Sequence, residues 1–260
     1  RLKEARSLTY FEFITLASLI VFNKYETDVA ILEVGLGGRL DAVNIVDPDI
    51  ALITSIGLDH QSILGNSREE IALEKAGIMR EKIPVVCSDG EIPDAICTRA
   101  REIRADLSVL GVDYTFEREG NTWAWWNSQN SLSNIPLPSL IGYHQLQNAA
   151  GVLQVLDLLK KQLPVSESSI RYGVRNAVLE GRFQLIGESA QIVLDVAHNG
   201  QAAETLAAAL QTLPVARRTH AIVGMLSTKN HIDFLRPLLK KVDCWHFATL
   251  PDSRSSNAET

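Results

Sequence analysis

The sequence is poor in the features that mark secreted, disulfide-bonded or membrane-spanning proteins. Its 260 residues include three cysteines, Cys87, Cys97 and Cys244, and no two of them have C-x-x-C spacing. This argues against a disulfide framework or a zinc site and favours reduced thiols in a cytoplasmic protein. No apolar run approaches the roughly 18 residues of a membrane span. The charged start of the sequence does not resemble a signal peptide.

Positive charge is also in short supply. Lys and Arg number 25 against 31 Asp and Glu, which gives a net charge of -6 at pH 7. General binding of nucleic acid depends on Lys and Arg at phosphates, so we expect no nucleic-acid partner. Nucleotides are not excluded, because loops and metals hold them locally. Neither G-K-[ST] nor G-x-G-x-x-G occurs in the chain. Nothing in the sequence requires an oligomer, so we expect a monomer. We also expect no membrane partner.

An ordinary apolar fraction of 46% allows sizeable cores, and the length is sufficient for two domains. Short apolar runs alternate with helical patterns over the first two thirds, which is typical of βαβ units around a parallel sheet. Ser67 with Glu70 forms a capping-box pattern at the start of one helix, and Gly77 fits its end. The predicted strands are 28–34, 49–56 and 83–87, and the predicted helices are 10–23, 67–79 and 92–105.

The pattern changes at 114–127, where aromatic residues alternate around a short turn and predict a β-hairpin. Aromatic side chains can stack on bases, but cross-strand packing is favoured in an acidic chain. Two helices follow the hairpin, and a second α/β series begins after them, so we place the domain boundary between 1–178 and 179–260. The later predictions are helices at 143–161, 167–178, 200–210 and 231–240, and strands at 191–194, 221–225 and 243–248.

The most informative stretch is 31–41, where an apolar run ends in a buried-looking acid, Glu33, and opens into a glycine-rich turn. Ligands of open α/β sheets bind beyond the carboxyl ends of the strands. Glu33 ends one predicted strand, and Asp59 and His60 lie just past the next, so they would meet at one rim if the two strands are neighbours. Carboxylate oxygens suit Mg²⁺ and an imidazole can join them, but a satisfied buried acid and a loop histidine fit the sequence equally well. For the turn, a tight strand-to-helix connection is favoured.

Two further residues gain interest from their positions alone. A lysine on a helix is usually only a solvated charge. Lys75 is of interest because it lies on the first long helix after the His60 loop. Asp195 repeats the strand-end position in the second domain, and Asn199 can cap the helix that follows it. Helix N-termini also accept ligand oxygens, so both a structural and a ligand role stay open there.

Seven segments in this order resemble the Mur ligase superfamily, and within it the folylpolyglutamate and dihydrofolate synthases. One such segment would be weak evidence, whereas seven in the same order are specific. The resemblance implies a central ATPase domain with a parallel sheet at 1–178 and a Rossmann-like C-terminal glutamate ligase domain at 179–260, both partial. The segments are Ser7-Leu-Thr-Tyr-Phe-Glu-Phe13, Leu32-Glu-Val-Gly-Leu-Gly-Gly-Arg-Leu-Asp41, Thr54-Ser-Ile-Gly-Leu-Asp-His60, Glu74-Lys-Ala-Gly-Ile78, Gln147-Asn-Ala-Ala150, Gly181-Arg-Phe183 and Asp195-Val-Ala-His-Asn199.

The resemblance implies an ATP-dependent ligase reaction. ATP phosphorylates a carboxylate of dihydropteroate or a folate, and the amine of L-glutamate attacks the acyl phosphate to form an amide. The implied cofactors are ATP and Mg²⁺, and the implied partners are these small molecules.

The resemblance also assigns residues. Glu33 and His60 would be Mg²⁺ ligands, and Lys75 would be carbamylated, which makes these three the catalytic residues. The positions that contact ATP are Asn148, Arg182, Asp195 and His198, with Arg182 as a phosphate clamp. The pteroate or folate side comprises Thr9, Tyr10, Phe11, Glu12, Arg39 and Leu40.

The family's P-loop, with its Mg²⁺-binding serine, has no counterpart in this sequence, nor has the last part of the C-terminal domain. We therefore expect the 260-residue chain alone to have no ligase activity. Two alternatives stay open: a Mur-type ligase of cell-wall precursors, and a non-catalytic remnant without a P-loop. Assays with dihydropteroate against a UDP-muramoyl acceptor separate the two ligases. An in-frame G-x-x-G-K-[ST] in the upstream coding sequence would exclude the remnant.

Overall fold

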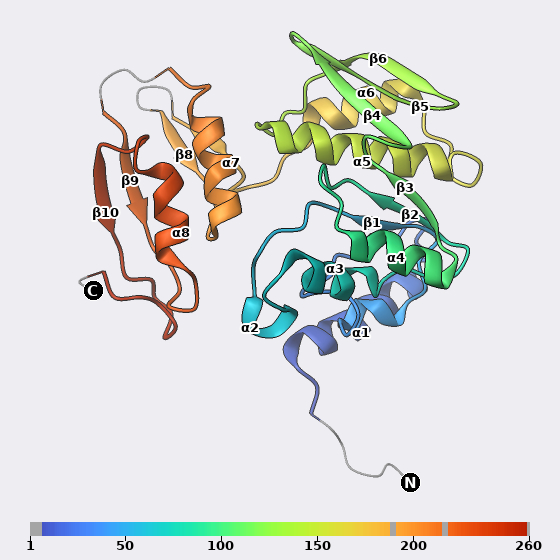
Figure 1. The fold of residues 1–260 in the computed structure, drawn as a ribbon, viewed down its shortest axis with the longest axis horizontal. Helices are drawn as coiled ribbons and strands as arrows, with labels where there is room; N and C mark the ends of the chain where they lie inside the picture. The colour runs from blue at the N-terminus through green and yellow to red at the C-terminus, as the bar shows by residue number, and fades with distance from the viewer. Residues whose placement is uncertain (1–6, 188–190, 215–217, 259–260) are drawn as a thin grey trace. The chain divides into compact units, whose positions relative to one another are not determined.

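The computed structural model describes residues 7–187, 191–214 and 218–258. The chain divides into two compact units, Arg1–Tyr114 and Thr115–Thr260, and each is described by itself (Figure 1). This division into compact units differs from the domain boundary expected between 178 and 179, which stays a prediction.

The first unit is built on a parallel sheet in the order β1-β2-β3, which confirms the predicted parallel α/β architecture. The strands are β1 (Ala51–Ile53), β2 (Pro84–Cys87) and β3 (Asp106–Val109). The crossovers contain α3 (Arg68–Ala76) and α4 (Asp94–Ile103), whose apolar faces pack with the strands into one core. Other elements of this unit are α1 (Tyr10–Lys24), the 3-10 helix η1 (Ala42–Ile45) and α2 (Gln61–Leu64).

Helix α3 begins and ends as its local sequence predicts. The Ser67 side chain accepts a hydrogen bond from the Glu70 backbone N–H at 3.2 Å, and the Glu70 carboxylate accepts one from the Ser67 N–H at 3.2 Å. This reciprocal capping box satisfies two of the backbone donors that every helix start leaves open. Gly77 occupies the C-cap.

The predicted strand at 28–34 is wrong. The structure has no strand there, and Ile31 is 88% exposed instead of buried. A β-strand exists only where a neighbour completes its hydrogen-bond ladder, and no described strand pairs with this segment on the free side of β1. Glu33, at the end of the segment, is exposed for the same reason, which corrects its expected burial.

The second unit begins with an antiparallel sheet in the order β4-β5-β6. Its strands are β4 (Tyr114–Glu119), β5 (Thr122–Asn127) and β6 (Ser131–Pro136). The predicted hairpin is confirmed, whereas β6 was not predicted. Trp123 is fully buried, meets the Phe116 ring edge-on at 6.2 Å, and donates from its indole N–H to the Pro136 carbonyl at 3.0 Å. The aromatic residues therefore pack in the hairpin. Helices α5 (Tyr143–Leu159) and α6 (Glu167–Asn176) follow.

The last part of the chain contains two strand pairs. Strands β7 (Gln184–Ile186) and β8 (Ile192–Leu194) pair antiparallel, and β9 (His220–Val223) and β10 (Cys244–Phe247) pair parallel. Helices α7 (Gly200–Leu210) and α8 (His231–Leu235) form a small core with β9 and β10. The helix predicted at 231–240 is α-helical only to Leu235 and continues as the 3-10 helix η2 (Arg236–Leu238). The change occurs because Pro237 lacks the backbone N–H that an α-helix needs.

Among the described residues, no helix is long and apolar enough to cross a membrane. All three cysteines are free thiols, as their spacing predicted, and Cys87 is buried.

Candidate functional site

The carboxyl ends of β1 and β2 form the rim where the sequence places a ligand. After β1 the chain runs through Ile56 to His60, which has a left-handed backbone (φ 51°) at the start of α2. The His60 side chain is 46% exposed, with its Nε2 4.0 Å from the Asp59 carboxylate. The imidazole is therefore accessible at the rim, as a metal ligand must be.

Lys75 lies in the last turn of α3 and is half-buried. Burial lowers the pKa of its amine because a charged ammonium loses water there. The neutral amine is consequently more populated than on an exposed lysine. Only the neutral form of a lysine is a nucleophile, so this environment favours covalent modification of Lys75.

The glycine-rich turn docks against the end of α3. A Cβ atom on Gly38 would lie 2.9 Å from the carbonyl oxygen of Glu74, and one on Gly77 would lie 2.4 Å from the Cβ of Arg39. The Arg39 backbone N–H donates to the Glu74 carbonyl at 2.9 Å. These two glycines thus permit a close backbone approach between the turn and the helix that carries Lys75.

Arg39 is held by an acid that the sequence reasoning missed. Its guanidinium donates from Nε and NH2 to the Glu74 carboxylate at 3.1 and 2.9 Å, although the side chain remains 54% exposed. Asp41 closes the turn by accepting from the backbone N–H groups of Leu36 at 2.9 Å and Val43 at 3.0 Å. Glu74 stands in one of the seven segments, but no sequence pattern paired it with Arg39, because the two residues are 35 positions apart.

The segment expected on the folate side begins α1. Thr9 and Glu12 form a capping box, and the Thr9 backbone N–H, followed by its hydroxyl, lowers the pKa of Glu12. Both side chains are therefore engaged in the helix start. The Phe11 ring lies 2.9 Å from where a Cβ on Gly35 would be, so α1 borders the glycine turn. Tyr10 and Leu40 are 82% and 80% exposed.

The structure brings together two of the loops expected to contact ATP. The Asp195 carboxylate accepts from the backbone N–H groups of Phe183 and Ala197, both at 2.8 Å. Arg182, just before Phe183, is exposed at this junction. His198 lies in the same loop, with its Nδ1 2.9 Å from the Val196 carbonyl. Asp195 thus ties the Gly-Arg-Phe turn to the Ala-His-Asn loop.

His144, at the start of α5, is a further residue that the sequence reasoning missed. Its Nδ1 is buried without a hydrogen-bond partner among the described residues. Burial lowers the pKa of His144; the Asp195 charge opposes this shift and the Arg182 charge adds to it. The charges of Asp195 and Arg182 therefore act on this helix start, and Asn148 lies one turn further along α5. The sequence signal is Gly142, two residues earlier, because it has φ 125° and a Cβ there would lie 2.5 Å from the His144 ring.

The residues present fit Mg²⁺ better than a metal enclosed by protein ligands. Across the described parts of the chain, no group of three or more His, Cys, Asp or Glu side chains is placed to hold a metal ion. Mg²⁺ binds through one or two carboxylates together with waters and substrate phosphates. The exposed carboxylate of Glu33 matches that donor chemistry, and the exposed imidazole of His60 can join it.

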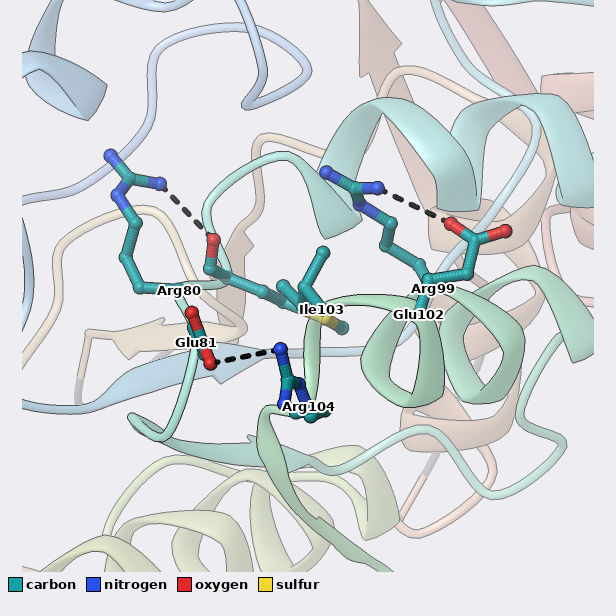
Figure 2. A pocket seen from close by; sticks show the side chains of 7 residues that line it. Arg80, Glu81, Arg99, Glu102, Ile103 and Arg104 are labelled. Carbon is teal, nitrogen blue, oxygen red and sulfur yellow. Dashed lines mark hydrogen bonds and ion pairs between the residues drawn. The ribbon is translucent and has the colours of Figure 1, made fainter.

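A pocket of 360 Å³ lies elsewhere in this unit, beside the amino end of β2 and the carboxyl end of α4. Its arginines have partners (Figure 2): Arg99 contacts Glu102 at 3.2 Å, and Arg104 contacts Glu81 at 3.5 Å. Arg80 pairs with the Asp47 carboxylate and also donates to the Met79 carbonyl at 3.2 Å. Because these charges are already compensated, the pocket is not a strong anion site, and it is distinct from the rim.

Comparisons with known proteins agree on one family. The Mur ligase middle domain matches residues 2–156, and the glutamate ligase domain of Mur ligases matches residues 181–260. The chain is 44% identical to the dihydrofolate synthase/folylpolyglutamate synthase of Escherichia coli (strain K12), over 97% of this chain and 58% of that protein.

Solved structures give the same result. The structure of E. coli FolC in complex with DHPP and ADP matches with a TM-score of 0.92 at 44% identity, over 97% of this chain and 60% of that one. A bifunctional folylpolyglutamate synthase/dihydrofolate synthase with Mn, AMPPNP and L-glutamate bound matches with a TM-score of 0.88 at 43% identity, over 97% and 60%. The chain thus spans about three fifths of the length of these relatives.

Proposed function

The chain belongs to the Mur ligase family, and from this we propose that it serves an ATP-dependent ligase joining the carboxylate of dihydropteroate or a folate to the amine of L-glutamate. The observation that carries the proposal is Lys75, half-buried with a lowered pKa on the helix to which the glycine turn is docked. The similarity to dihydrofolate and folylpolyglutamate synthases supports the substrate class.

On the metal side, Glu33 and His60 would hold Mg²⁺, which when bound neutralises charge on the phosphoryl group being transferred. Lys75 would be carbamylated. An ammonium close to a divalent cation would repel it, whereas a carbamate would attract it. The lowered pKa of Lys75 supports this role because carbamylation requires the neutral amine.

On the nucleotide side, the exposed guanidinium of Arg182 would contact phosphate. Asp195 already accepts two backbone hydrogen bonds, so it would also fix the loop geometry around Arg182. Asn148 and His198 would complete the contacts with ATP. The ADP and AMPPNP bound in the similar structures support this assignment.

On the folate side, Phe11, Tyr10 and Leu40 offer exposed apolar surface beside the glycine turn. Thr9 and Glu12 would act indirectly, by capping the start of α1. Arg39 would act from the position in which its ion pair with Glu74 holds it. Aromatic and aliphatic surface of this kind suits a flat aromatic ring. The same proposal includes a monomer that acts in the cytoplasm, which the free thiols support.

The decisive experiment measures ADP formation by the full-length protein with L-glutamate and one acceptor at a time: dihydropteroate, a folate, or a UDP-muramoyl precursor. We expect glutamate-dependent ADP formation with dihydropteroate, a folate or both, and none with the muramoyl acceptor. ADP formation with the muramoyl acceptor alone would overturn the proposed substrate class.

Replacing Glu33 by glutamine should weaken the metal requirement of this reaction without unfolding the protein. The substitution removes a charged oxygen ligand of a hard cation from an exposed position. The Mg²⁺ concentration for half-maximal activity should rise by at least about tenfold. Glu117→Gln, which alters an exposed acid on β4, serves as the matched control and should leave the titration unchanged. Superimposable Mg²⁺ titrations of Glu33→Gln and wild type would remove Glu33 from the metal site.

A further inference from the structure

A half-buried ion pair lies at the rim of the parallel sheet and has no part in the mechanism above. Asp89 follows β2 and is only 5% exposed. Its Oδ2 lies 3.0 Å from NH2 of Arg68, the first residue of α3. Removing a carboxylate from water is costly unless hydrogen bonds and an opposite charge compensate it.

The pair binds both backbone polar groups of Ile56, which lies in the loop after β1. The Ile56 N–H donates to Asp89 Oδ2 at 2.7 Å, and the Ile56 carbonyl accepts from Arg68 Nε at 2.9 Å. Ile56 itself is 1% exposed. Asp89 also accepts from the Glu91 N–H at 2.9 Å, and Arg68 NH2 donates to the Glu91 carbonyl at 2.8 Å. The loop after β1, the loop after β2 and the start of α3 are thus joined at one point.

This point lies between the two elements that carry proposed catalytic side chains. Ile56 precedes His60 by four residues in the same loop, and Arg68 precedes Lys75 by seven residues on α3. Seven residues are close to two helical turns, so Arg68 and Lys75 share a face of the helix about 10 Å apart along its axis. Whatever holds Ile56 to Arg68 therefore sets where the His60 loop lies relative to the Lys75 helix.

We propose that Asp89 and Arg68 are positioning residues for the metal site, holding the His60 loop and the Lys75 helix at a fixed spacing. The inference rests on the proposed function for its catalytic consequence, but the loop restraint itself does not depend on it. Neither side chain contacts reacting atoms in this scheme. Both act through the Ile56 peptide and the start of α3.

The restraint is tested first by amide hydrogen exchange in the full-length protein. Asp89→Asn keeps the size of the side chain but removes the charge that holds Arg68 and the Ile56 N–H. Exchange across 54–60 should become at least about tenfold faster, while α4 keeps its protection. The matched control is Glu102→Gln, which breaks the exposed Arg99–Glu102 pair of the same unit and should not alter 54–60. Unchanged exchange of 54–60 in Asp89→Asn would overturn the inference.

The catalytic consequence is tested in the full-length protein. Asp89→Asn should raise the Mg²⁺ concentration for half-maximal ADP formation by about tenfold, with the KM for the folate acceptor unchanged. Asp89→Glu, which restores the charge, should recover part of the loss. A fall in kcat with an unaltered Mg²⁺ titration would identify a merely structural pair and overturn the positioning role. If wild type forms no ADP with any folate acceptor, the proposed function and the catalytic part of this inference fail, and the exchange result alone decides the restraint.

Discussion

Replacing Lys75 by alanine in the full-length protein should lower ligase turnover by roughly a thousandfold, the scale of losing one charged contact to a transition state. A carbamate on the half-buried Lys75 would replace an ammonium that repels a divalent cation by an anion that attracts it. Alanine keeps helix propensity, so the helix should persist. Turnover is measured as ADP formation under saturating ATP, glutamate and folate acceptor.

Short carboxylates make this prediction specific. Acetate or propionate, added to Lys75→Ala, can occupy the space of the lost side chain and supply a carboxylate, so partial recovery of turnover is expected. Lys24→Ala is the matched control, because Lys24 also lies in the last turn of a helix but is exposed. Wild-type turnover in Lys75→Ala would remove this residue from the mechanism, and a loss that no carboxylate restores would argue against the carbamate.

Replacing Gly77 by alanine should destabilise the protein by about 3 kcal/mol, the upper range for overpacking. The new Cβ would lie 2.4 Å from the Cβ of Arg39 and 2.5 Å from its Cα. A backbone atom cannot rotate away as a side-chain tip can, so the turn or the end of α3 must shift. The φ of Gly77 is -63°, which alanine adopts readily, so the expected loss is steric and not conformational. Thermal unfolding followed by circular dichroism should show a melting temperature lower by about 6–12 °C.

Gly173 provides the matched control for that substitution. It lies within α6, and a Cβ there would have no atom within 4 Å. Gly173→Ala should therefore stabilise the helix by about 0.5–1 kcal/mol, because alanine loses less backbone entropy on folding. If both alanine variants melt at or above the wild-type temperature, the close approach at Gly77 does not exist in solution.

The sequence predicted best those features, such as helix ends, that depend only on residues close together along the chain. Ser67, Glu70 and Gly77 mark the ends of α3 because capping is completed within one turn. The helix at Gly200–Leu210 was placed correctly for the same reason, with the Asn199 side chain accepting from the Ala202 N–H at 2.9 Å. Strand 28–34 failed because its apolar composition says nothing about whether a partner strand lies beside it.

The candidate site shows the same division. Its chemically distinctive residues, Lys75 and Asp195, stand out by position along strands and helices. The acids that hold the surrounding loops do not, because the partners of Glu74 and Asp89 are Arg39 and Arg68, which only the folded chain brings near. The glycine turn illustrates the limit best. Its composition indicated a ligand loop or a tight connection, whereas part of its glycine requirement comes from packing against α3.

The contact between Gly77 and Arg39 has a consequence for how this chain can vary over evolutionary time. Two positions 38 apart in the sequence share a space too small for a second side-chain carbon. A larger residue at 77 becomes acceptable only if the backbone of the turn moves, and then Gly38, the Arg39–Glu74 pair and the hydrogen bond to Glu74 must change with it. We therefore expect these positions to co-vary among related sequences. A change at one of them should be tolerated only together with changes at the others.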